Sequence, residues 1–135
     1  MRVGAVEVFI PTGARFLYGL VGGTFKPDVT GKFCVDVGIS ALGLGLLKDN
    51  LAVNLDRVHK GLSRPYAEAV VKGIEQEHSR WTNGYLNVNC GANSDIGSAE
   101  VVFRYLGTAL SRLFTLDEMA PSRQQLADLF PTIRA

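Results

Sequence analysis

The apolar residues of this chain change their periodicity at about Ser63, and this change limits the folds available to it. Before Ser63 the apolar positions are mostly β-branched or aromatic and are interrupted by glycines rather than helix caps, which is typical of strands. After Ser63 they recur at helical spacing, with one short alternating stretch in between. Strands followed by helix, strand and helix predict a two-layer α+β sandwich with the helices on one face of the sheet.

The first half of the chain is expected to contain four strands. They lie near Ala5–Ile10, Arg15–Phe25, Lys32–Ile39 and Leu51–Leu55. The second and third are predicted to pair as a hairpin, because proline, aspartate, threonine and glycine between residues 26 and 31 favour a turn.

The second half is expected to be mainly helical. Serine caps and proline positions predict helices from Ser63 to about His78, from Ser98 to Phe114, and over Pro121–Phe130. Gly84–Asn89 alternates apolar and polar residues as a half-buried strand does. Gly107 lies inside the second helix and indicates close packing against the sheet. Residues 1–135 are therefore predicted to form one domain, with residues 115–135 as a C-terminal extension.

Composition limits the classes of function. The chain has 135 residues, of which 47% are hydrophobic, and 14 basic against 13 acidic residues leave a net charge of +1. This balance argues against a strongly basic nucleic-acid arm. No apolar run reaches the roughly 18 residues of a membrane-spanning helix, and the N-terminus lacks the pattern of a signal peptide. We expect a cytoplasmic protein that is not in a membrane, with Cys34 and Cys90 as buried free thiols.

An apolar segment from Gly38 to Leu47 carries three internal or flanking glycines that weaken helix and strand alike. Exposure of such a segment would leave an adhesive patch on the surface. It is therefore expected either to be part of the core or to form a contact between copies of the chain.

Three stretches resemble domain IV of translation elongation factor G. Residues 12–21 resemble the pattern T-G-G-R-x-x-Y-G-x-V of its first hairpin at six positions. Residues 61–75 are similar to G-V-I-P-x-x-Y-x-x-A-V-x-K-G-I-x-E at its first helix, and residues 98–103 are similar to S-S-E-M-A-F at its last helix. The resemblance spans Thr12 to about Leu113 and implies a β-β-β-α-β-α core.

The chain departs from this family in three places. It is longer by roughly twenty residues between the first hairpin and the first helix, where an extra strand or loop is inserted. Ala14 replaces the second glycine of the hairpin tip, and residues 90–97 lack the histidine that the family presents there. The absence of a G-x-x-x-x-G-K-[ST] motif indicates a stand-alone domain without GTPase activity.

The resemblance implies a binding site at the loop tips, which in the elongation factor meet mRNA and tRNA in the small ribosomal subunit. It places Thr12, Gly13, Ala14 and Arg15 on one tip, with Arg15 suited to gripping a phosphate. The other interpretation is a plain turn with a solvated arginine.

A second basic group precedes the first helix. Arg57, Lys60 and Arg64 surround His59 and either form a small anion site at the helix N-terminus or belong to a solvated turn. Asp95 and Glu100 are explained as a turn residue and a first-turn helix acid.

Three hypotheses about function follow. The first is a module that binds the ribosome, RNA or a translation factor without a cofactor. The second is a homo-oligomeric interaction or assembly protein that uses the apolar segment. The third is a small-molecule enzyme, although no catalytic residue, metal ligand set or nucleophile motif is recognised.

Overall fold

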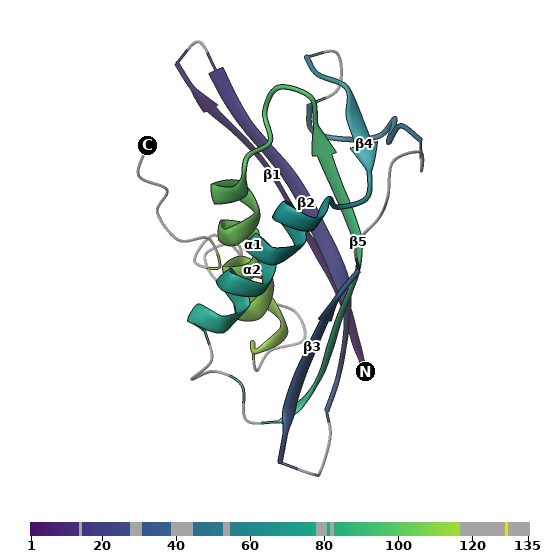
Figure 1. The fold of residues 1–135 in the computed structure, drawn as a ribbon, viewed down its shortest axis with the longest axis vertical. Helices are drawn as coiled ribbons and strands as arrows, with labels where there is room; N and C mark the ends of the chain where they lie inside the picture. Colours follow the sequence, from purple (N-terminus) through teal and green to yellow (C-terminus); the bar gives the residue numbers. More distant parts are fainter. Residues whose placement is uncertain are drawn as a thin grey trace.

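The fold is described from a computed structural model, within residues 1–13, 15–27, 31–38, 45–52, 55–77, 81, 83–116 and 129. In these residues five strands form one mixed sheet and two helices cover one of its faces (Figure 1). The elements, in chain order, are β1 (Arg2–Thr12), β2 (Arg15–Lys26), β3 (Phe33–Val37), β4 (Val58–Lys60), α1 (Arg64–Gln76), β5 (Gly84–Ser94) and α2 (Glu100–Phe114). The predicted α+β class is confirmed.

The sheet has the order β1-β2-β5-β3, and β4 pairs with the far end of β5. β1 and β2 form a long antiparallel hairpin, in which Thr12 and Arg15 are the last pair before the tip. β5 runs antiparallel to β2 and to β4, and parallel to β3. The expected hairpin of the second and third strands is therefore wrong, because β5 lies between them. Alternating side chains reveal that a segment is a strand, but they do not reveal its neighbour.

The main core lies between the sheet and the two helices. It contains Val6, Val21, Leu86, Val88, Val70, Ile74, Val102, Phe103, Leu106 and Leu110, all nearly inaccessible to water. The helices touch through glycines: a Cβ on Gly107 would lie 2.3 Å from the carbonyl oxygen of Val70, and one on Gly73 would lie 2.0 Å from that of Arg104. The prediction that Gly107 packs against the sheet is thus wrong, because it packs against α1.

A second, smaller core covers the opposite face of β2. It consists of Tyr18, Ala52, Val58 and Ala92, with Phe9, Phe16, Leu20 and Leu47 packed around them. The Tyr18 hydroxyl donates a hydrogen bond of 2.6 Å to Glu7, and the backbone N–H of Leu51 donates to the same carboxylate oxygen. The segment that precedes α1 is thereby fastened over the sheet, and β2 is buried on both faces in this half of its length.

Several predicted boundaries differ from the structure. The expected strand at Leu51–Leu55 is wrong, because Leu51 and Ala52 form a turn and the fourth strand is β4. The first helix matches its prediction closely, whereas β5 continues five residues beyond Asn89. The extension of β5 follows from its pairing with β4, a long-range contact that local alternation does not record.

Three further expectations concern single residues. Ser98 is not the N-cap of α2; Ala99 occupies that position, and the Ser98 hydroxyl instead donates to the carbonyl oxygen of Tyr18. Cys34 and Cys90 are free, but both are exposed rather than buried. Cys34 lies at an outward position of β3, between the partly buried Phe33 and Val35, and Cys90 follows the exposed Asn89 on β5.

Within the predicted apolar segment Gly38 to Leu47, residues 39–44 lie outside the described residues. Leu47 packs against the second core, while Leu46 remains 44% exposed. The predicted terminal helix over Pro121–Phe130 also lies outside the described residues, apart from Leu129, which is buried. In the part of the chain that the structure describes, no helix is long and apolar enough to span a membrane.

Candidate functional site

One end of the sheet, called the loop end below, gathers three separate segments of the chain. The tip of the β1–β2 hairpin, the turn before β4 and the loop between β5 and α2 lie toward the top of Figure 1, whereas α1 begins nearer the middle of the view. The hairpin projects furthest, and Gly13 at its tip has a φ of 70°, a left-handed conformation that favours glycine.

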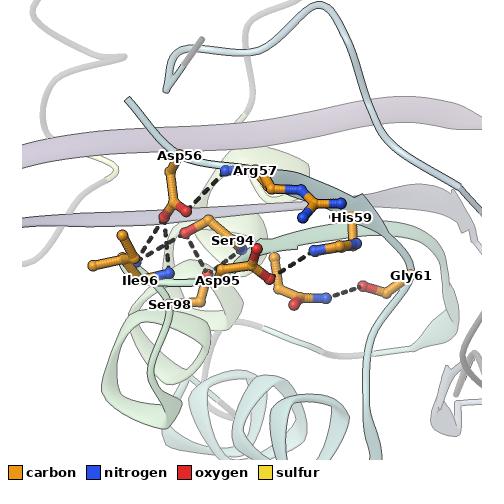
Figure 2. A network of polar contacts seen from close by, with 10 residues as sticks. Asp56, Arg57, His59, Gly61, Ser94, Asp95, Ile96 and Ser98 are labelled. Atoms are coloured by element: carbon orange, nitrogen blue, oxygen red, sulfur yellow. Dashed lines mark hydrogen bonds and ion pairs between the residues drawn. The ribbon is translucent and has the colours of Figure 1, made fainter. Parts of the chain in front are cut away.

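The turn before β4 and the loop after β5 are joined through the carboxylate of Asp56 (Figure 2). One of its oxygens accepts the backbone N–H groups of Ile96 and Gly97, each at 2.9 Å. The other accepts the N–H of Arg57 at 2.8 Å, and the carbonyl oxygen of Arg57 in turn accepts the N–H of Asp95. The two connections therefore form one hydrogen-bonded unit.

The pKa of the Asp56 carboxylate is lowered in the folded protein. Burial acts to raise the pKa of Asp56, but hydrogen bonds from Ser94, Ile96, Gly97 and Arg57 outweigh burial and hold the pKa below its ordinary value. Asp56 is thus charged in the folded protein well into the acidic range. This charge is used internally, on backbone N–H groups, and it is not free to bind a cation.

The loop is also fixed to the hairpin. The N–H of Tyr18 donates to the carbonyl oxygen of Gly97 at 2.8 Å, and the Ser98 hydroxyl donates to the carbonyl oxygen of Tyr18. A Cβ on Gly97 would lie 2.5 Å from the Phe16 ring, so only glycine allows this close approach. The base of the hairpin tip and the Asp56 turn therefore meet at the same residue.

His59 forms the second polar contact between β4 and the loop. Its Nε2 lies 2.7 Å from Oδ1 of Asp95, and both side chains are partly exposed. Asn93 strengthens the same region, because its side-chain amide donates to the carbonyl oxygen of Gly61 just before α1. Asp95 therefore links the loop after β5 to β4 through His59.

The sequence-predicted hairpin residues are exposed at the tip. Thr12, Gly13 and Arg15 are accessible to water, and Ala14 lies outside the described residues. The Arg15 side chain has no hydrogen bond or ion pair with any residue that the structure describes. It is available to a ligand.

The second predicted group is arranged less compactly. Arg57, Lys60 and Arg64 are all exposed, and Arg64 is the first residue of α1. Because successive side chains of an extended chain point to opposite sides, Arg57 shares a side with His59, whereas Lys60 points the other way. Arg57 is the member of the group that the Asp56 network holds in place.

A depression of about 430 Å³ lies between the two joined connections. It is lined by Leu55, Asp56, Arg57, Asp95 and Ile96. Sequence reasoning missed Asp56, Leu55 and Ile96 as members of a site. The turn-forming run Asp95 to Ser98 was the only local signal, since the contact with Asp56 spans about forty positions of the chain.

Comparison with protein-family models and with the sequences of curated proteins identified no match to this chain. Among the residues described, no three His, Cys, Asp or Glu side chains are grouped so as to hold a metal ion. What this end of the molecule binds is therefore inferred from its geometry.

Proposed function

We propose that the protein contains an RNA-binding module that docks on the ribosome through the loop end of its sheet. The observation that carries this proposal is the pair of exposed arginines at that end, Arg15 and Arg57, with exposed Lys60 and Arg64 further along the chain between β4 and α1. The resemblance of three stretches to domain IV of elongation factor G, whose loop tips face RNA, also supports RNA binding.

Charge at this end favours a polyanion over a neutral partner. Two of the neighbouring carboxylates are engaged within the protein, Asp56 with backbone N–H groups and Asp95 with His59. The four basic side chains have no hydrogen-bonded or ion-paired partner among the described residues. Arginine suits phosphate in particular, since its planar guanidinium donates two parallel hydrogen bonds to phosphate oxygens.

The near-neutral total charge is compatible with such a site. Counterion release depends on the phosphates neutralised at the interface rather than on the charge of the whole molecule. Four basic residues at and near this end give a modest, strongly salt-dependent affinity, which is appropriate for docking on a large RNA surface.

Co-sedimentation of the purified protein with ribosomes and isolated subunits over a salt series tests this proposal. Binding to the small subunit that weakens with salt is expected. Arg15→Glu should weaken it further and reduce the slope of log affinity against log salt by about 0.7 to 0.9, the contribution of one phosphate contact.

Arg104→Glu is the matched control, because Arg104 is exposed on α2 away from the loop end and the substitution changes the net charge equally. Wild-type protein that fails to bind ribosomes or RNA at low salt would refute the proposal. Equal losses in Arg15→Glu and Arg104→Glu would refute the assignment to this end.

Self-association through the segment before β4 is the second candidate function. Leu46 and Leu51 of this segment are 44% and 55% exposed, which is unusual for leucines beside a packed core. Sedimentation velocity over a concentration series tests it: a dimer that Leu51→Asp converts to monomer would support assembly, and a monomer at all concentrations would exclude it.

A further inference from the structure

The depression between the turn before β4 and the loop after β5 combines three kinds of surface. Leu55 and Ile96 contribute large apolar side chains that are 59% and 74% exposed. Arg57 contributes a cation and Asp95 a hydrogen-bond acceptor. Few ligands satisfy all three kinds of surface at once.

The backbone under these side chains is already ordered. Asp56 bonds to both connections, and the N–H groups of Leu55 and Asp56 donate to the carbonyl oxygen of the fully buried Ala52. A ligand that binds here does not need to order the loops first, which removes a large part of the entropic penalty of association. The exposed apolar side chains are therefore held outward rather than free to fold back into the core.

The charged groups of the depression indicate the form of the ligand. The Arg57 guanidinium has no partner among the described residues, so it is free to bind an anion. One oxygen of Asp95 bonds to His59, and none of the described residues donates to its second oxygen. In Figure 2 Ile96 and the Arg57 guanidinium lie on either side of the Asp95 carboxylate, so a ligand that meets both is apolar on one side and anionic on the other.

We propose that this depression binds one unpaired nucleotide of an RNA strand. The base lies against Leu55 and Ile96, the phosphate meets Arg57, and a donor on the base edge meets Asp95. This inference rests on the proposed function and specifies its ligand. The depression of about 430 Å³ falls within the range of about 300 to 1,000 Å³ typical of small-molecule sites, and its open form suits a nucleotide that remains part of a chain.

Unpaired bases are the usual targets of sequence-dependent RNA recognition, because their faces and edges are both accessible. Apolar side chains are able to hold the face of a base, as aromatic ones do. A base pair inside a duplex offers neither face to Leu55 and Ile96. The depression should therefore prefer single-stranded RNA to a duplex of the same length.

Asp95 adds a preference among the bases. Cytosine carries an exocyclic amino group that donates to a carboxylate, whereas uracil has the carbonyl oxygen O4 at that position and only its ring N3–H as a donor on this edge. A carboxylate oxygen of Asp95 placed at that position should accept from the cytosine amino group and repel O4 of uracil. An affinity difference on the order of fivefold is expected for one such hydrogen bond.

Fluorescence anisotropy with labelled single strands of about ten nucleotides tests the inference. The full chain should bind oligocytidine about fivefold more tightly than oligouridine, and either more tightly than a duplex of equal length. Ile96→Ala should weaken oligocytidine binding about tenfold through lost apolar contact. Asp95→Asn should reduce or reverse the base preference, since an amide is able to donate to uracil while still accepting from His59.

Val3→Ala is the matched control for the apolar contact. Val3 is 75% exposed on β1 at the end opposite the hairpin tip, it does not line the depression, and its substitution should leave oligonucleotide binding unchanged. Urea denaturation of each variant verifies that its fold is retained.

The inference is overturned if oligocytidine and oligouridine bind equally, or if Ile96→Ala binds as the wild type does. It is also overturned by a dimer that Ile96→Ala dissociates, because the depression is then occupied by a second copy. Its failure is separable from that of the proposed function. Salt-dependent ribosome binding that requires Arg15 but not Ile96 leaves the proposed function intact, whereas no binding to any RNA removes both.

Discussion

Replacing Asp56 with alanine removes the group that joins the turn before β4 to the loop after β5. Its carboxylate accepts three backbone N–H groups, from Arg57 at 2.8 Å and from Ile96 and Gly97 at 2.9 Å. No other described side chain bonds to both connections in this way. The substitution therefore tests whether the loop end is organised as the geometry indicates.

The expected loss follows from the surroundings of each N–H group. A hydrogen bond to a charged group contributes about 1.5 to 3 kcal/mol when its partner would otherwise be buried without one. Arg57 and Ile96 are exposed, so their N–H groups regain water in the variant, and the Gly97 N–H keeps the Ser94 hydroxyl at 3.0 Å. The loss should therefore be about 2 kcal/mol, close to that of removing a strong helix cap, rather than the sum of three bonds.

The pH dependence has a defined sign. The pKa of Asp56 is lower in the folded protein than its unfolded value of about 3.9, so the unfolded state binds the proton more readily. The stabilisation by the charged form is fully present above that unfolded pKa and is lost as the pH falls through the lower, folded pKa. Asp56→Asn, which has no charge to lose, should approach the wild type in stability over the same acidic range.

Urea denaturation followed by circular dichroism measures both effects. With an m value of about 2 kcal/mol per molar urea, Asp56→Ala should lower the transition midpoint by about 1 M at neutral pH. Asp49→Ala is the control, because Asp49 is an exposed carboxylate of the same segment with no hydrogen bond to the described residues. The reasoning would be refuted by an Asp56→Ala midpoint equal to that of the control. It would also be refuted if the wild type remained more stable than Asp56→Asn at a pH below the folded pKa of Asp56.

Three further substitutions test the packing of the fold as a whole. Gly107→Ala should destabilise by more than about 3 kcal/mol, since its Cβ would lie 2.3 Å from the Val70 carbonyl oxygen and the helices would have to separate; thermal denaturation measures this. Tyr18→Phe should cost about 1 to 2 kcal/mol in urea denaturation, because it removes the buried hydroxyl that donates to Glu7. Arg2→Met should lower stability by about 1 kcal/mol and increase hydrogen exchange in the last turn of α2, whose carbonyl oxygens accept from its guanidinium.

Local pattern was sufficient to predict the class of the fold. The helix from Arg64 and the strand from Gly84 are specified by periodicity within the segment itself, and both were predicted within a few residues. The sheet order was not predictable in this way, because the neighbours of β5 are chosen by packing of distant residues. The fourth strand was misplaced for the same reason. Val58 begins this strand because it pairs with Ser94 of β5, whereas Leu51 and its neighbours resemble a strand only in composition.

The exposed basic residues of the site were partly predictable from the sequence, whereas the hydrogen-bond network around Asp56 was not. Arg15 was identified through the resemblance to the first hairpin of elongation factor G domain IV, and Arg57 because it belongs to a basic group before the first helix. The role of Asp56 depends on N–H groups about forty positions later in the chain, and nothing near Asp56 indicates that contact. The sequence places Ile96 in the loop before the last helix, and only the structure shows that it is 74% exposed and lines the depression.

Tyr18 links the core and the site, and this determines which variants are informative about function. Its ring is fully buried in the second core, while its own N–H and carbonyl oxygen bond to Gly97 and Ser98 of the loop. A change at Tyr18 must therefore move the loop end as well as weaken the fold, so any loss of binding in such a variant would be indirect. Arg15 and Ile96 are exposed instead, which makes their side chains the direct tests of what this end binds.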